Sequence, residues 1–110
     1  MKKILIVLLL TAIAAAAKSQ MPAGHAVAEN LSIKMKDSLG LTESQRVQLY
    51  QVNLQLHEAK MSKRQLYTGD SLQIHIQRVE GTRDSLYRQV LTTEQHQLYL
   101  QKKNNLINNQ

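Results

Sequence analysis

Hydrophobic positions recur at helical spacing along most of the chain, and no segment of useful length alternates with the period of a strand. Apolar side chains follow three- and four-residue steps from about Ala26 to Leu39, where Gly40 is well placed as a helix stop. A similar seam predicts a helix from Leu72 to about Val90, and its members are Leu72, Ile76, Val79, Leu86 and Val90. Gly81 lies inside it and weakens it by about 1 kcal/mol relative to Ala, so we expect a bend there. The pattern predicts an all-α fold.

The segment from Thr42 to about Leu66 is predicted to be one long helix with two apolar stripes on roughly opposite sides. One stripe is Val47, Tyr50, Leu54 and Met61; the other is Leu49, Val52, Leu56, Ala59 and Leu66. A helix with two apolar faces has two surfaces to bury. In so small a chain one face belongs to the core, and the other indicates a partner subunit or a ligand. The alternative is that apolar residues scattered on a helix surface need no partner.

A pentapeptide of the form LTxxQ occurs twice, as Leu41-Thr42-Glu43-Ser44-Gln45 and as Leu91-Thr92-Thr93-Glu94-Gln95. Thr followed three residues later by Gln is a capping box, in which each side chain bonds to the other residue's backbone N–H. We therefore expect helices to start at Thr42 and Thr92, within two helical hairpin arms. The residues assigned to this structural motif are Leu41, Thr42, Gln45, Leu91, Thr92 and Gln95.

The stretch from Tyr67 to Ser71 contains Gly, Asp and Ser and is predicted to be a turn. Asp70 or Ser71 is expected to cap the helix that follows. These connections complete four predicted helices in antiparallel hairpins.

The N-terminus has the pattern of a secretory signal peptide. Two lysines precede an apolar run from Ile4 to Ala17, and Ala17-Lys18-Ser19 fits the small-x-small cleavage rule. This predicts a signal peptide at residues 1–19, cleaved before Gln20, and a single domain at residues 20–110 with flexible ends. An uncleaved anchor is the alternative, but the apolar run is about fourteen residues and a span needs roughly twenty.

The composition of the exported part excludes several classes of protein. It contains no Cys, so a lipoprotein or a disulfide scaffold is excluded. Removing Lys2, Lys3 and Lys18 leaves 11 of the 14 Lys and Arg residues against 8 Asp and Glu, a net charge of +3. That is well short of a nucleic-acid-binding composition, and no nucleic-acid partner is expected. A domain of about 90 residues has a thin core, so a homodimer is expected to supply buried area.

No motif for catalysis is present: the chain has no nucleophile motif, no Gly-rich phosphate loop and no persuasive carboxylate pair. We therefore expect neither an enzyme nor a cofactor. His57 and Met61, spaced i, i+4, are an alternative half-site for copper or nickel. No cluster of His residues completes a coordination shell, and a lone helical His is usually solvated or packed.

Basic residues gather at the end of the long helix, at Lys60, Lys63 and Arg64. One interpretation is a solvated face with ion pairs to nearby acids. The other is a positive field beside exposed apolar side chains, which attracts acidic or partly unfolded chains and holds them by apolar contact. The candidate client-binding surface on this basis is Arg46, Leu49, Val52, Leu56, Lys60, Lys63 and Arg64.

An exported, Cys-free, all-helical chain with two LTxxQ pentapeptides resembles the Spy/CpxP family of small periplasmic proteins. The heptapeptide from Leu39 to Gln45 is similar to the family's LxLTxxQ entry into its long helix, and Val90 to Gln95, followed by Leu98-Tyr99, is similar to its second copy. The resemblance covers about Leu31 to Leu106. It implies a thin, curved antiparallel dimer with a basic, partly apolar concave face.

The resemblance also implies a periplasmic location and ATP-independent chaperone activity, or regulation, in envelope stress. Our leading expectation is therefore a chaperone-like protein that binds unfolded or misfolded envelope proteins, with no stable membrane insertion. The alternative is a heavy-metal-responsive sensor or accessory regulator, as in a related branch of the family. A regulator that docks on a membrane sensor kinase would use the same fold.

Overall fold

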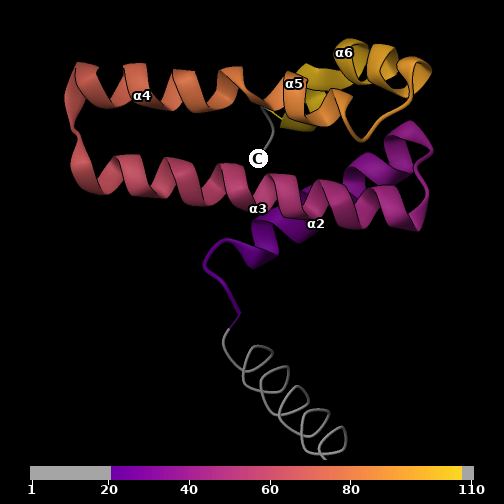
Figure 1. Ribbon diagram of the computed structural model, residues 1–110, viewed down its shortest axis with the longest axis horizontal. Coiled ribbons are helices and arrows are strands. Elements are labelled where there is room, and N and C mark those ends of the chain that lie inside the picture. The colour runs from indigo at the N-terminus through magenta and orange to yellow at the C-terminus, as the bar shows by residue number, and fades with distance from the viewer. Residues whose placement is uncertain (1–20, 108–110) are drawn as a thin grey trace, which may run out of the picture.

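The computed structural model describes residues 21–107, and within that range every regular element is a helix (Figure 1). The helices are α2 (His25–Leu39), α3 (Glu43–Leu66), α4 (Gly69–Gly81), α5 (Arg83–Arg88) and α6 (Thr93–Ile107). The predicted all-α class is confirmed. In the described range, no helix combines the length and the apolar character that crossing a bilayer requires. The predicted signal peptide and its cleavage site lie outside the described residues.

The helices divide into a small bundle and a projecting arm. Helix α2 packs along the first part of α3, where His25 Nδ1 lies 2.7 Å from the hydroxyl of Tyr50. Helix α6 packs on α2 and α5, which closes the bundle. After the chain reverses at Tyr67 and Thr68, α4 lies beside the second half of α3 and contacts only α3 and α5 among the described helices (Figure 1).

The core lies entirely in the bundle. Tyr87 from α5 and Tyr99 from α6 are fully buried and meet edge to face, with ring centroids 5.0 Å apart. Aromatic pairs in this geometry contribute beyond their buried area, and here they replace the Phe and Trp that the chain lacks. The rest of the buried cluster is aliphatic: Leu31, Met35, Leu39, Leu41, Leu49, Leu91 and Leu106.

Both LTxxQ pentapeptides form the predicted capping boxes. The Gln45 N–H donates to Thr42 Oγ1 at 3.1 Å, and the Thr42 N–H donates to Gln45 Oε1 at 3.0 Å. The second copy repeats this geometry, with 3.2 Å from Gln95 N to Thr92 Oγ1 and 3.0 Å from Thr92 N to Gln95 Oε1. The predicted helix starts at the two threonines are therefore confirmed.

The two capping boxes also bind each other. Gln45 Nε2 donates to Gln95 Oε1 at 2.7 Å, and Gln95 Nε2 lies 3.3 Å from Gln45 Oε1. Each amide also donates to the carbonyl two residues before the other threonine, at 3.1 Å for Val90 O and 3.3 Å for Gly40 O. The repeats thus meet as a nearly symmetric pair, which we call the glutamine clasp, and it joins the start of α3 to the start of α6.

The connection into α4 differs from the prediction. Helix α4 begins at Gly69, whose φ of 60° lies in the left-handed region that favours glycine. Its N-cap is Thr68, without a side-chain cap, so the expected cap at Asp70 or Ser71 is wrong. Asp70 instead lies in the first turn, where the helix dipole favours a carboxylate.

The predicted helix from Leu72 to Val90 is divided in two. Helix α4 ends at Gly81, and Thr82 separates it from α5, with Thr82 Oγ1 donating to the Val79 carbonyl at 2.7 Å. The expected bend at Gly81 is therefore confirmed. The physical reason is that glycine lowers the cost of leaving the helix and the threonine hydroxyl takes up a freed carbonyl.

Candidate functional site

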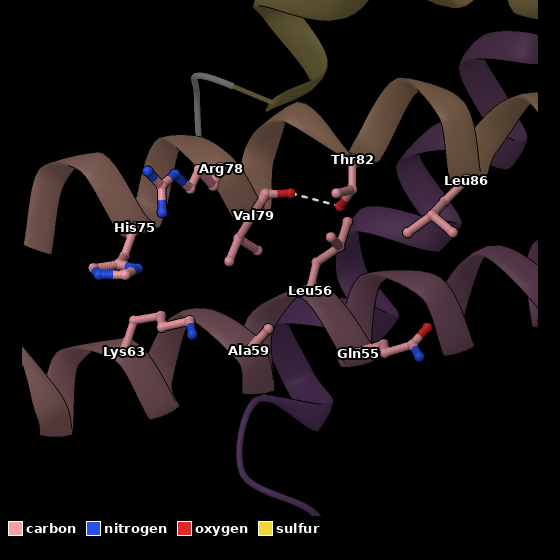
Figure 2. Close-up of a pocket in the computed structure, with 9 residues that line it drawn as sticks. All are labelled: Gln55, Leu56, Ala59, Lys63, His75, Arg78, Val79, Thr82 and Leu86. Atoms are coloured by element: carbon pink, nitrogen blue, oxygen red, sulfur yellow. Dashed lines mark hydrogen bonds between the residues drawn. The ribbon is translucent and has the colours of Figure 1, made fainter.

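An open groove of about 560 Å³ runs between α3 and the α4–α5 segment (Figure 2). This volume is within the range of small-molecule sites, roughly 300–1,000 Å³. Helix α3 supplies one wall and the α4–α5 segment supplies the other (Figure 2). The lining residues are Gln55, Leu56, Ala59, Lys63, His75, Arg78, Val79, Thr82 and Leu86.

The groove exists because the arm has only two layers. No residue of α4 is buried, although Leu72, Ile76 and Val79 form the apolar seam that the periodicity predicted. Each of the three is only half-buried, because α4 contacts no described helix other than α3 and α5. A helix pair with no third layer leaves part of its apolar surface in water, and such surface is a candidate interaction site.

One end of the groove is cationic. Figure 2 shows Lys63, His75 and Arg78 at that end, Leu86 and Gln55 at the other, and Ala59 and Val79 between them. Within residues 21–107, neither Lys63 nor Arg78 has an ion pair with an acidic side chain. The groove therefore presents two cations without bound counter-charges beside an apolar floor.

His75 is held at this end by a stack on Tyr67, with ring centroids 3.8 Å apart. Partial burial, and then the positive charges of Lys63 and Arg78, lower the pKa of His75 below its ordinary value. This shift favours the neutral imidazole, which can both donate and accept a hydrogen bond.

A network of hydrogen bonds and ion pairs connects α3 to α4 and α5. Glu80 accepts from Arg83 Nε at 2.8 Å and is also ion-paired with Lys60. The buried Arg83 donates to the Tyr87 hydroxyl at 2.7 Å, and that hydroxyl donates to Asn53 Oδ1. Burial alone would raise the pKa of Glu80, but the hydrogen bonds from Arg83 and Lys60 outweigh it and hold this pKa at about 2.

Burial raises the pKa of Tyr87 to about 12, because it disfavours the phenolate more than nearby Arg83 favours it. Tyr87 therefore stays protonated and keeps its bond to Asn53. The buried Asn53 Nδ2 has no hydrogen-bond partner among residues 21–107.

The structure corrects the predicted client-binding stripe on α3. Leu49 is fully buried and Leu56 is 3% exposed, and Val52 packs against the same core. Leu49 and Val52 therefore belong to the chain's own core, whereas Leu56 lies at the groove between α3 and the α4–α5 segment. The opposite stripe is the more exposed one, with Val47 at 43% and Met61 at 40%. Leu66, at the end of the predicted stripe, is 68% exposed, so the correction concerns Leu49, Val52 and Leu56 and not the whole stripe.

The predicted basic residues are not brought together either. Arg46 lies at the start of α3 and pairs with Glu29 at 2.9 Å and Glu43 at 2.6 Å. Lys60 is engaged by Glu80, as described above. Arg64 is exposed and donates to Met61 Sδ at 3.5 Å.

Of the seven predicted client-binding residues, the groove is lined by two, Leu56 and Lys63. The residues that sequence reasoning missed are mainly those of the opposite wall, His75, Arg78, Val79, Thr82 and Leu86. Val79 and Leu86 already belonged to the predicted apolar seam. The sequence did not reveal how α4 and α5 align with α3, and this alignment places the seam opposite Lys63.

The alternative metal half-site gains no further ligand. His57 packs over Gly24, where any Cβ would clash with the imidazole ring, and the sulfur of Met61 already accepts from Arg64. No cluster of three or more His, Cys, Asp or Glu suited to a metal ion occurs between residues 21 and 107. Metal binding by His57 and Met61 stays a prediction.

Comparisons of the chain with protein-family models, with curated proteins and with solved structures found no match. The resemblance to the Spy/CpxP family therefore rests on the quoted motifs. The expected regulatory partnership with a sensor kinase stays a prediction as well.

Proposed function

We propose that this chain is a periplasmic, ATP-independent chaperone-like protein that binds unfolded or misfolded envelope proteins with the arm formed by α3 and α4. The observation that carries the proposal is the open apolar groove with unpaired cations at one end. Leaving this apolar surface in water does not stabilise a folded monomer, so we expect the arm to bind another molecule.

Apolar side chains at the end of the arm extend this surface. Leu66 is 68% exposed and Ile74 is 51% exposed, and both lie on the two helices that form the groove. Each contact that removes apolar surface from water contributes roughly 25 cal/mol per Å². Many weak contacts of this kind hold a client without any nucleotide, and they release it when it folds and buries its own apolar groups.

The cationic end adds a long-range component. Lys63 and Arg78 attract acidic segments of a client before contact, which raises the association rate more than the final affinity. Added salt should therefore slow client capture.

We further propose that two copies associate as a curved antiparallel dimer of hairpin arms. The support for this is the thin arm itself, in which no residue of α4 is buried. A second copy would supply the missing layer on one side of the arm and leave the other side for clients.

The test is the aggregation of a chemically unfolded client protein with and without the purified chain. Suppression at stoichiometric amounts is expected, and it should weaken in Val79→Gln, which replaces an apolar lining residue of the groove. The matched control is Ile33→Gln, because Ile33 is 44% exposed on α2, away from the arm. Absence of suppression by the unaltered chain would remove the proposal.

A further inference from the structure

We propose that the groove between α3 and α4 binds a medium-chain amphipathic anion, such as a fatty-acid carboxylate, with its charged head at Lys63 and Arg78 and its alkyl chain toward Leu86. This inference is separate from the chaperone proposal, because it concerns a small ligand and its test contains no client protein.

The position of the ligand's charged head is inferred from the two cationic side chains at one end of the groove. Lys63 lines the α3 wall of the groove and Arg78 the α4 wall, and neither has an acidic partner in the described part of the chain. By contrast, the cations elsewhere on the arm's inner side, Lys60 and Arg83, are both held by Glu80. Two cations that share a groove without a counter-charge favour an anion between them, and a guanidinium binds carboxylates and phosphates through two parallel hydrogen bonds.

His75 adds a polar contact at the same end. It lines the groove beside both cations and is fixed in place by its stack on Tyr67. An imidazole can donate to an anionic oxygen. The charged head of the ligand would thus contact the two cations, Lys63 and Arg78, and the imidazole of His75.

The position of the ligand's alkyl chain is inferred from the apolar residues that line the rest of the groove. Beyond Lys63 the walls are Ala59, Val79, Leu56 and Leu86, and the far end is polar only at Gln55 and Thr82 (Figure 2). The hydroxyl of Thr82 is engaged by the Val79 carbonyl and offers a ligand no free proton. This stretch fits methylene groups, whose burial contributes about 0.8 kcal/mol each.

The length of the groove sets the size of the ligand. From Gln55 to Lys63 is eight residues of α3, or about 12 Å at 1.5 Å per residue. An extended chain advances about 1.2 Å per bond, so an alkyl chain of about ten bonds spans this distance. The cavity volume of about 560 Å³ also admits a molecule of this size.

The backbone of an extended polypeptide fits less well inside the groove, so a client would contact the groove with its apolar side chains while its backbone stays outside. Both walls are helices whose backbone groups are already bonded, so the N–H and C=O groups of an inserted peptide would lose water without gaining partners. A helix is 10–12 Å across and would lie over the groove rather than in it. An alkyl chain carries no polar groups along its length, and therefore it is the occupant we assign.

The experiment is calorimetric titration of the purified chain with decanoate, at concentrations at which decanoate is monomeric. The N-terminus of the protein is determined by mass spectrometry, so that any retained leader is known. We expect saturable binding of one decanoate per groove, with Kd about 0.1 mM or tighter. Decanol, which has the same chain without the charge, and hexanoate, which has the charge on a short chain, should each bind about tenfold more weakly or worse.

The variant that tests the head-group site is Lys63→Ala with Arg78→Ala, which should weaken decanoate binding by at least about tenfold. The matched control is Arg64→Ala, because Arg64 is the neighbouring cation on α3 but does not line the groove. The charge-conserving pair Lys63→Arg and Arg78→Lys should retain most of the binding. Circular dichroism confirms the helix content of each variant.

A second readout reports directly from the groove. A bound anion stabilises the imidazolium, so the pKa of His75 measured by NMR should rise when decanoate is added and should not rise with decanol. Decyl phosphate in place of decanoate identifies whether a carboxylate is required or any anionic head suffices.

Several results would overturn the proposal. One is no saturable binding of decanoate, including the case in which sedimentation shows that a second copy of the chain already covers the groove. Another is equal binding to the Lys63→Ala, Arg78→Ala variant, which would indicate adsorption to apolar surface alone. Loss of binding in Arg64→Ala, with retention in that double variant, would place the anion elsewhere.

Discussion

Replacing Gln45 with Ala tests the glutamine clasp, because its amide takes part in four hydrogen bonds. It accepts from the Thr42 N–H, donates to the Val90 carbonyl and exchanges bonds with the Gln95 amide in both directions. A protein hydrogen bond contributes about 0.5–1.5 kcal/mol net, and water replaces part of this at a half-exposed side chain. We expect Gln45→Ala to lower the free energy of unfolding by about 2 kcal/mol, and Gln95→Ala to do the same.

The double variant distinguishes a clasp from two independent caps. The bonds between Gln45 and Gln95 are lost in either single variant and cannot be lost twice. The double variant should therefore cost about 1 kcal/mol less than the sum of the singles. Two independent caps would give additive losses.

The assay is urea unfolding followed by far-ultraviolet circular dichroism, with thermal melts alongside. A loss of about 2 kcal/mol should lower Tm by roughly 8–16 °C in a domain of this size. The control is Gln48→Ala, whose exposed amide forms one bond, of 3.3 Å to Ser44, and which should change stability by less than about 0.5 kcal/mol. Strict additivity of the two singles, or no loss in either, would refute the clasp.

Three further predictions concern caps, core and pH. Thr42→Ala and Thr92→Ala should each cost about 1 kcal/mol, and an unchanged Tm for both would contradict the capping boxes. In urea unfolding, Leu49→Ala should cost about 2–5 kcal/mol, and Val47→Ala, on the opposite stripe of α3, should cost less than about 0.5 kcal/mol; the opposite order would mean that the other stripe forms the core. Because the pKa of Glu80 is held at about 2, against an ordinary 4.5, its ion pairs stabilise fully above pH 4.5 and lose this effect as the pH falls toward 2. The stability difference between the unaltered chain and Glu80→Gln should shrink over that interval, and a constant difference down to pH 2 would contradict this.

Helix starts and the bend could be predicted because their causes are local. Thr42 and Gln45 lie three residues apart, and one turn of helix suffices to bring their side chains to each other's backbone. The bend at Gly81 likewise depends on a single residue without a side chain. The N-cap at Thr68 was missed because Asp and Ser are preferred over Thr at N-cap positions, which favoured Asp70 and Ser71. The left-handed backbone conformation of Gly69, with which α4 begins, cannot be recognised from residue types.

The candidate site was predicted only in part because its parts are distant in the sequence. Periodicity showed that α3 has two apolar faces, but both faces have the same helical spacing. Which of them is buried depends on where the other helices dock, and Leu49 is buried in a core to which α2, α5 and α6 also contribute. The groove depends, in addition, on how α4 aligns with α3, because this alignment places Val79 and Arg78 opposite Lys63.

The amino-acid sequence by itself determined the all-helical class, the two capping boxes and the weak point at Gly81, since each follows from residues within one or two turns of helix. Only the tertiary structure decided that the two glutamines bind each other, that the Tyr87 hydroxyl on α5 bonds to Asn53 on α3, and that the cations Lys63 and Arg78 share a groove. The physical reason is that such contacts join segments brought together by packing, and their partners are chosen by the shape of the whole core rather than by any local pattern.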